Sequence, residues 1–220
     1  MEQSNEEMTE LKRLWNSYFY PNSTVLINKL GITNQEELEQ KEAEITFEKI
    51  IELYENPVVG NFDAEHLCQI HRYLFDELYE WAGEYRYVDI RKTTGFTSSQ
   101  YIDTFLNEEL KMMNQEMRNV HSNYSLASFL ATYYVQLIKI HPFREGNGRA
   151  IREFLQEFVV AKTKHFEPPL ELDWTKFNGD IFLENVKFSL VFRSQIENEF
   201  FKALVPANLE KNEDQNKNVK

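Results

Sequence analysis

Residues 141–152 read His-Pro-Phe-Arg-Glu-Gly-Asn-Gly-Arg-Ala-Ile-Arg, and this polar stretch separates two apolar segments. Upstream, apolar residues recur at helical spacing: Leu126, Phe129, Leu130, Tyr133 and Leu137. Downstream, a second set follows at i, i+3, i+4 and i+7: Ile151, Phe154, Leu155 and Phe158. Pro142 should end the first helix, and the second should begin near Asn147. The stretch is therefore predicted to be a loop between two helices that are each buried on one side.

The same helical pattern extends outward from this loop. Thr33 with Glu36 predicts a capping box and a helix reaching about Tyr54. Asp63 is a plausible N-cap for a second helix, and Gly83 lies just past its expected end. Further helices are expected over residues 99–120 and, in one or two shorter pieces, between residue 169 and about residue 204.

One segment breaks the helical pattern. Tyr85, Tyr87 and Val88 favour strands, and residues 93–95, Thr-Thr-Gly, are typical of a turn. A short β-hairpin over residues 86–96 fits best. The predicted fold class is therefore all-α with one small hairpin.

Composition limits what the chain can do. The 220 residues suit one domain, or one domain with a small appendage. A net charge of −12 opposes binding to nucleic acid or to an anionic membrane. One cysteine allows no internal disulfide, and no long apolar run or signal-like N-terminus is present, so we expect a cytoplasmic protein. The polar residues 1–9 are expected to fray, and residues 211–220 to be disordered.

The loop carries the residues of a phosphate-binding site. Gly146, Asn147 and Gly148 enter a helix, where backbone N–H groups and the helix dipole favour an anion. Arg149 and Arg152 lie at i and i+3 on one helix face and together suit a polyphosphate. Taken singly, the arginines could be solvated and the glycines could simply turn the chain. Taken together, two glycines at a helix start without a ligand are hard to justify.

Two further residues complete the set. Glu145 is the carboxylate that a Mg²⁺ ion bridging nucleotide phosphates would require. His141 can take a proton near neutral pH, because the unperturbed pKa of histidine is about 6.5. The loop thus combines a phosphate cradle, a metal ligand and a general base.

Other candidates favour structural interpretations. His66 and His71 lie five residues apart in the sequence rather than the four that suits a helical metal pair, so packing or polar contacts are expected. Cys68 fits a small buried residue better than a nucleophile. The aromatic residues Tyr85, Tyr87 and Phe96 could pack the hairpin or line a groove, and packing is the favoured interpretation.

Residues 141–152 closely resemble the signature of the Fic family, His-Pro-Phe-x-(Asp/Glu)-Gly-Asn-Gly-Arg-x-x-Arg, at every fixed position. The resemblance extends upstream through Gly60, Phe62-Asp63, His66-Leu67, Ile70-His71, Leu74-Phe75, Tyr79, Trp81-Ala82-Gly83, Arg86 and Lys92. It covers roughly residues 24–204. On this basis we expect an N-terminal extension over residues 1–20, a Fic domain over 21–205 with a flap at 85–98 and the active loop at 141–152, and a tail over 206–220.

The resemblance implies a protein AMP transferase that uses ATP. His141 would deprotonate a Ser, Thr or Tyr hydroxyl of a target protein, which attacks the α-phosphate and expels pyrophosphate. Glu145 would hold Mg²⁺, and the flap would hold the target segment by strand addition.

The remaining roles also follow from the resemblance. Gly146, Asn147 and Gly148 would form the anion hole, with the Asn147 side chain on the α-phosphate. Arg149 and Arg152 would neutralise the departing phosphates. Phe143 would anchor the loop, whereas Arg144, at the variable position, needs no catalytic role.

Two alternatives and several partners stay open. A Doc-like phosphotransferase is disfavoured, because the related proteins have a lysine where this chain has Gly148. A non-catalytic nucleotide-binding or protein-binding module is disfavoured by the presence of His141. The family's inhibitory pattern, (Ser/Thr)-x-x-x-Glu-(Gly/Asn), is met only imperfectly. Ser194 to Glu197 with Asn198 is one residue too short, and Thr33 to Glu37 is followed by Leu38 instead of Gly or Asn. Inhibition by a small antitoxin-like protein, or by no helix at all, therefore remains open. Automodification, homo-oligomers and the choice of nucleotide base also remain open.

Overall fold

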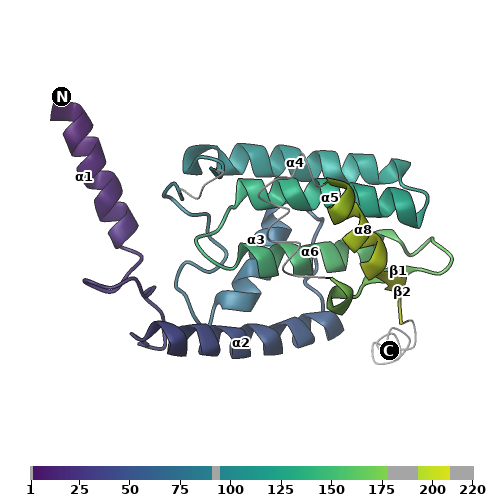
Figure 1. The fold of residues 1–220 in the computed structure, drawn as a ribbon, viewed down its shortest axis with the longest axis horizontal. Helices are drawn as coiled ribbons and strands as arrows, with labels where there is room; N and C mark the ends of the chain where they lie inside the picture. The colour runs from purple at the N-terminus through teal and green to yellow at the C-terminus, as the bar shows by residue number, and fades with distance from the viewer. Residues whose placement is uncertain (1, 91–94, 178–192, 209–220) are drawn as a thin grey trace. The chain divides into compact units, whose positions relative to one another are not determined.

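The computed structural model describes residues 2–90, 95–177 and 193–208 (Figure 1). Its elements, in chain order, are α1 (Glu2–Asn16), α2 (Gln35–Glu55), α3 (Ala64–Phe75), η1 (Ser99–Tyr101), α4 (Ile102–Glu116), η2 (Met117–Asn119), α5 (Asn123–Ile140), α6 (Asn147–Lys162), β1 (Leu170–Leu172), η3 (Trp174–Lys176), α8 (Arg193–Ala203) and β2 (Leu204–Pro206). The chain is mostly helical, which confirms the predicted class. Residues 211–220, predicted to be disordered, lie outside the described residues.

Two compact units divide the chain. One comprises Met1–Asn114 with Gln136–Phe154, and the other Gln115–Val135 with Leu155–Lys220. The whole of the predicted active loop belongs to the first unit. The domain boundaries inferred from the sequence stay a prediction.

Helix starts agree closely with the sequence, and helix ends less so. Asp63 is the N-cap of α3, as predicted, and accepts the His66 N–H at 3.0 Å. The N-cap of α2 is Asn34 rather than Thr33, because the Asn34 side chain accepts the Glu37 N–H. Helix α3 ends at Phe75, well before Gly83, which has a positive φ of 80° in the turn that follows. The sequence thus located the helix starts better than the helix ends.

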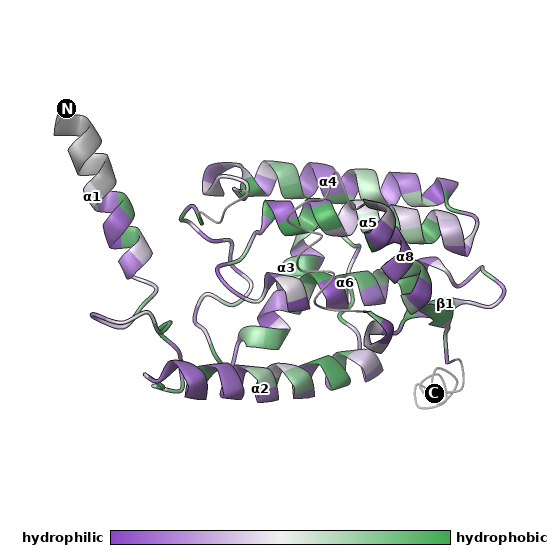
Figure 2. Ribbon diagram, in the orientation of Figure 1, coloured by the Kyte–Doolittle hydropathy of each residue, from purple (hydrophilic) through white to green (hydrophobic). Residues whose placement is uncertain are grey.

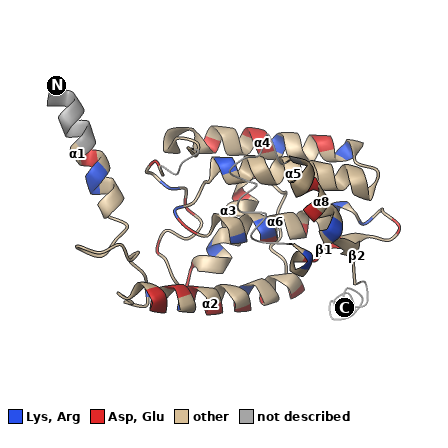
Figure 3. Cartoon of the chain, viewed as in Figure 1, with Lys and Arg blue, Asp and Glu red and all other residues tan. Residues whose placement is uncertain are grey.

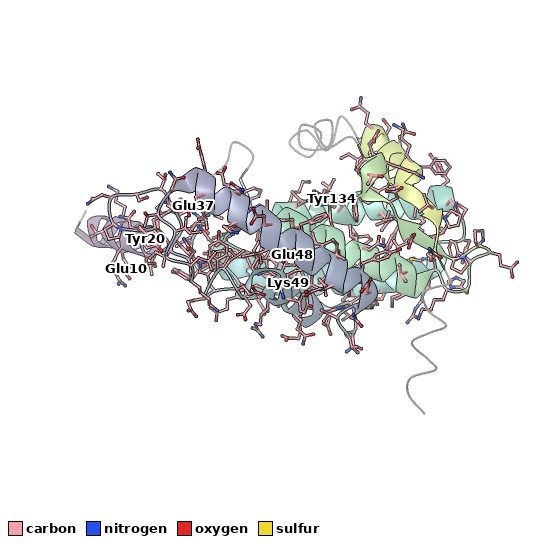
Figure 4. All side chains as sticks on the ribbon, turned by 90° about the horizontal axis from the view of Figure 1, so that it is seen from below. Glu10, Tyr20, Glu37, Glu48, Lys49 and Tyr134 are labelled. Carbon is pink, nitrogen blue, oxygen red and sulfur yellow. The ribbon has the colours of Figure 1, made fainter. Side chains whose placement is uncertain are left out.

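In the first unit, α2 packs against α3 (Figure 1). The buried residues of α3 include Leu67, Ile70 and Leu74, each with no exposed surface. Hydrophobic and hydrophilic residues both occur along α2, and several of its residues are acidic (Figures 2 and 3). Its Lys49, labelled in Figure 4, forms an ion pair with Glu77 at 2.9 Å. Burial fixes the position of α3, the helix whose His71 contacts the active loop.

The second unit contains a small sheet that the sequence analysis missed. Strands β1 and β2 pair antiparallel, with Leu170 opposite Pro206 and Leu172 opposite Leu204. Helix α8 packs on both strands and on η3, as Figure 1 shows for the strands. Strands of three residues are too short to show the alternation that reveals a strand in a sequence.

The predicted hairpin over residues 86–96 is not borne out by the residues that the structure describes. Residues 85–90 and 95–98 contain no strand, and residues 91–94 lie outside the description. The backbone of this flap bonds to other parts of the chain instead: Arg86 N–H donates to Pro142 O at 2.8 Å, and Thr97 N–H to Lys139 O at 3.0 Å. Asp89 accepts from the Ser98 hydroxyl at 3.1 Å. The flap is therefore tied to the active loop rather than paired as a ladder.

Residues 1–9 were expected to fray, yet residues from Glu2 onward form the first part of α1. An i,i+3 ion pair between Arg13 and Glu10 at 2.6 Å supports the helix. Within the described ranges, no helix is long and apolar enough to cross a membrane.

Candidate active site

The active loop begins with an unusual backbone conformation at His141. Its N–H closes the last turn of α5 by donating to Leu137 O at 3.0 Å, and its φ is +51°. This left-handed conformation is disfavoured for a residue with a side chain, and such strain gathers at functional sites. With Pro142 next, the chain leaves α5 at the residue predicted to be the general base.

Asn147 holds the loop closed. Its Oδ1 accepts the Phe143 N–H at 2.9 Å, and its Nδ2 donates to Phe143 O at 2.8 Å. Asn147 is 2% exposed. Phe143 is fully buried and its ring stacks on His71 at 3.8 Å between centroids, which agrees with its predicted anchoring role. The Asn147 amide thus fixes loop geometry, and its expected contact with an α-phosphate stays a prediction.

The two loop glycines are glycines for different reasons. Gly146 has a φ of +79°, and a Cβ there would overlap the ring of Phe75. Gly148 lies in the first turn of α6, and a Cβ there would meet nothing within 4 Å. Backbone and packing therefore require Gly146, whereas neither requires Gly148. Since glycine weakens a helix relative to alanine by roughly 1 kcal/mol, the open space at Gly148 points to a ligand that approaches the backbone.

Arg149 is engaged from three sides. Its guanidinium pairs with the carboxylate of Glu42 on α2, donates to the Thr46 hydroxyl at 3.3 Å and lies 4.8 Å from the centre of the Phe75 ring. Glu145 is a more distant partner at 3.8 Å. Glu42 also accepts the hydroxyl of Tyr79. A ligand phosphate would therefore meet an arginine whose position α2 already sets.

Arg152 differs from Arg149. It is partly exposed, and within the described part of its unit it has neither a hydrogen bond nor an ion pair. A cation one helical turn beyond the loop, with its donors unused, is available to an anion. The two arginines that the sequence placed on one face thus differ in the structure: Arg149 is held by side chains of α2, and Arg152 is not.

Glu145 is accessible to a metal ion. Its carboxylate is 47% exposed and accepts the N–H of Gly146 at 3.0 Å. No group of three or more metal-ligating side chains occurs in the part of the chain that the structure describes. A single accessible carboxylate fits Mg²⁺, because this ion usually takes one or two protein carboxylates and completes its shell with waters and substrate phosphates.

The flap covers the predicted base. The Phe96 ring stacks on the His141 ring with 3.8 Å between centroids and 6° between planes. Packing was the favoured interpretation of Phe96 in the sequence, and its ring packs on the imidazole itself. Tyr87, on the other arm, stacks on Tyr18 at 4.7 Å.

Arg144 anchors the N-terminal segment. Its guanidinium lies over the rings of Trp15, Tyr18 and Phe19, at 4.7, 5.3 and 5.0 Å from their centres. Burial lowers the pKa of Arg144. The residue at the signature's variable position therefore joins the loop to a segment that the sequence analysis treated as an extension.

The other residues weighed in the sequence have structural contacts. His66 accepts the Phe62 N–H at 3.2 Å, as expected for a polar contact. Cys68 is buried, and burial raises the pKa of its thiol to about 11, which keeps it protonated and a poor nucleophile. The sequence did not predict that Glu42 pairs with Arg149. Helix α2 is rich in glutamate, and the spacing of these residues does not distinguish Glu42 from the others.

The chain is similar to known proteins in sequence and in fold. The model of the Fic/DOC family matches residues 61–159. A protein adenylyltransferase named VbhT from Bartonella schoenbuchensis is 34% identical over 163 residues, which are 72% of this chain and 32% of that protein. The chain thus spans about a third of the length of that relative. A probable protein adenylyltransferase Fic from Salmonella typhimurium is 33% identical, over 65% of this chain and 72% of that protein.

Solved structures show the same fold. The BepC protein from Bartonella tribocorum, crystallised with AMPPNP, is 24% identical, with a TM-score of 0.74 over 88% of this chain and 98% of that one. The N-terminal Fic domain of a Bartonella quintana effector gives a TM-score of 0.76 at 23% identity, over 91% of this chain and 97% of that one. Signature, fold and sequence identity agree, and the chain therefore belongs to the Fic/DOC family.

Proposed function

We propose that this protein transfers AMP from ATP to a Ser, Thr or Tyr hydroxyl of a target protein. The observation that carries the proposal is the open space at Gly148, a glycine in the first turn of α6 that neither backbone angle nor packing requires. The start of α6 supplies N–H groups without helical partners, and the helix dipole favours an anion there. The relatives named as adenylyltransferases support the choice of AMP as the transferred group.

In this reaction the target hydroxyl oxygen bonds to the α-phosphorus, and the bond from that phosphorus to the oxygen bridging to the β-phosphate breaks. The imidazole of His141 takes the hydroxyl proton, and pyrophosphate leaves. Arg149 and Arg152 offset the charge on the leaving group. Asn147 keeps the loop in shape through its bonds to the Phe143 backbone.

Glu145 would hold Mg²⁺ when nucleotide binds. The ion supplies charge neutralisation for the phosphates. The partial exposure of the Glu145 carboxylate supports this assignment. Because Arg149 lies 3.8 Å from Glu145, the carboxylate is also oriented by a neighbouring cation.

Partners and location form part of the proposal. The target segment would dock at the flap, near Phe96, and the protein would act in the cytoplasm. A separate antitoxin-like inhibitor, automodification and a homo-oligomer are included as hypotheses. The inhibitor hypothesis rests on the imperfect inhibitory pattern at Ser194 to Asn198.

The test uses the purified protein, a cell lysate and ATP labelled at the α-phosphate or, separately, at the γ-phosphate. We expect protein-bound label from the α-phosphate only, lost in His141→Ala and kept in the matched variant His121→Ala, whose exposed histidine lies outside the loop. Label from the γ-phosphate would indicate phosphate transfer instead. If the purified protein bound ATP but no protein in the lysate acquired label from either phosphate, a non-catalytic binding module would be favoured.

A further inference from the structure

Arg86 is a buried cation whose hydrogen bonds all go to backbone. The residue is 1% exposed. Its guanidinium donates to the carbonyl oxygens of Val88 at 2.7 Å, His141 at 2.8 Å and Ile140 at 3.4 Å, and also to that of Thr97. The Asp89 carboxylate approaches only to 3.9 Å.

These acceptors lie on three segments that the sequence keeps far apart. Val88 and Thr97 belong to the two arms of the flap, on either side of residues 91–94. Ile140 and His141 form the junction between α5 and the active loop. One side chain therefore joins both flap arms to the residue predicted to be the base.

Only arginine suits this set of acceptors. Its planar guanidinium offers five donors in a fixed fork, whereas lysine offers three from a single point. Burial lowers the pKa of Arg86, with Asp89 as the largest opposing influence. A buried cation is tolerated when its donors are satisfied, and here the carbonyl oxygens satisfy them.

The position of the bond to His141 matters most. His141 has a φ of +51°, which its own side chain disfavours, and Arg86 Nε holds the carbonyl of that same residue. The bond to Thr97 holds the residue after Phe96, whose ring stacks on the imidazole. The Arg86 guanidinium thus holds the backbone carbonyl of His141. Through Thr97 it also holds the segment that carries Phe96, whose ring covers the imidazole.

We propose that Arg86 is a positioning residue that fixes the imidazole of His141 for proton transfer by clamping both flap arms to the active loop. The inference rests on the proposed function in that it assigns the step affected. It concerns the base and the flap, because among the described residues Arg86 forms no hydrogen bond or ion pair with Gly148, Arg149 or Arg152. Loss of Arg86 should therefore lower kcat and leave nucleotide affinity nearly unchanged.

The experiment compares Arg86→Lys and Arg86→Met with wild type, at a temperature where circular dichroism shows each protein folded. We expect kcat for AMP transfer to fall by roughly 100-fold in Arg86→Met, since a displacement of about 1 Å can have that effect, and by less in Arg86→Lys. The dissociation constant of magnesium AMPPNP should stay within about twofold. Leu53→Ala, a truncation of a residue buried on α2, serves as the control for general destabilisation and should keep wild-type kcat.

Hydrogen exchange tests the clamp without any transfer assay. The amides of Thr97 and His141, bonded to Lys139 O and Leu137 O, should lose protection in Arg86→Met but not in Leu53→Ala. Unchanged protection and unchanged kcat in both Arg86 variants would overturn the proposal. So would a loss of AMPPNP affinity equal to the loss of kcat. If wild type bound nucleotide but transferred nothing, the proposed function would fail while the exchange result still decided the role of Arg86.

Discussion

His71 on α3 donates from Nε2 to the backbone carbonyl of Glu145, 3.0 Å away. The direction of this bond follows from the other ring nitrogen, because Nδ1 lies 2.8 Å from the N–H of Gly83 and must accept it. The imidazole is therefore neutral, with its proton on Nε2. Burial lowers the pKa of His71 to about 3, with Arg149 as a smaller influence in the same direction. A neutral histidine thus fastens the active loop to the core.

This pairing predicts a loss of stability in mild acid. In the unfolded chain the His71 imidazole gains a proton below about pH 6.5, whereas in the folded protein it stays neutral until about pH 3. The unfolded state therefore binds more protons in this window, and the unfolding free energy falls as pH falls. Between about pH 6.5 and pH 5 the expected loss is about 1–2 kcal/mol, measured by urea titration.

The controls for this prediction are His71→Asn, which does not titrate, and His121→Asn, which replaces an exposed histidine. The acid-dependent loss should shrink in His71→Asn and persist in His121→Asn. An equal pH dependence in wild type and His71→Asn would show that His71 is not the source.

The two loop glycines should respond in opposite ways to alanine. Gly146→Ala should lower the unfolding free energy by about 2–4 kcal/mol, because of its positive φ and the overlap with Phe75. Gly148→Ala should leave stability within about 1 kcal/mol of wild type and weaken AMPPNP binding at least about tenfold, since the methyl group fills the open space. Urea titration and calorimetric binding check both. Normal AMPPNP affinity in Gly148→Ala would contradict a nucleotide at this position.

The two signature arginines should separate binding from stability. Arg152→Ala should change the unfolding free energy by less than about 0.5 kcal/mol and weaken AMPPNP binding by roughly 10-fold to 100-fold. Arg149→Ala should also destabilise the fold, by about 1–3 kcal/mol, because it leaves the Glu42 carboxylate without its cation. The same two measurements apply. Equal stability of the two variants would contradict the unequal contacts seen here.

Glu197 should not act as an internal inhibitor. Its carboxylate accepts the Ser128 hydroxyl at 2.9 Å within the second unit. In the sequence, Ser194 is one position too close to Glu197 for the family's inhibitory pattern, an offset of about 100° around a helix. Glu197→Gly is expected to change target labelling little. A large rise in labelling, at equal folded protein by circular dichroism, would show that the shortened pattern still inhibits.

Local patterns explain what the sequence predicted well. The starts of α3 and α6 at Ala64 and Asn147 follow from a cap, a proline and apolar spacing within a few residues. Such signals act over one or two helical turns, so a single sequence contains them completely. The seven predicted site residues likewise lie within one stretch, 141–152, whose chemistry could be inferred before its geometry was known.

The sequence by itself determined the helical class and the active loop, whereas the tertiary structure decided what holds that loop. Arg149 pairs with Glu42, 107 residues earlier, and Arg86 reaches His141, 55 residues later. The flap gained no strand among its described residues, because its polar groups bond to the loop and to Arg86. Contacts of this kind depend on which segments meet when apolar faces are buried. Because the two partners lie far apart in the sequence, no local spacing of residues predicts that they will meet.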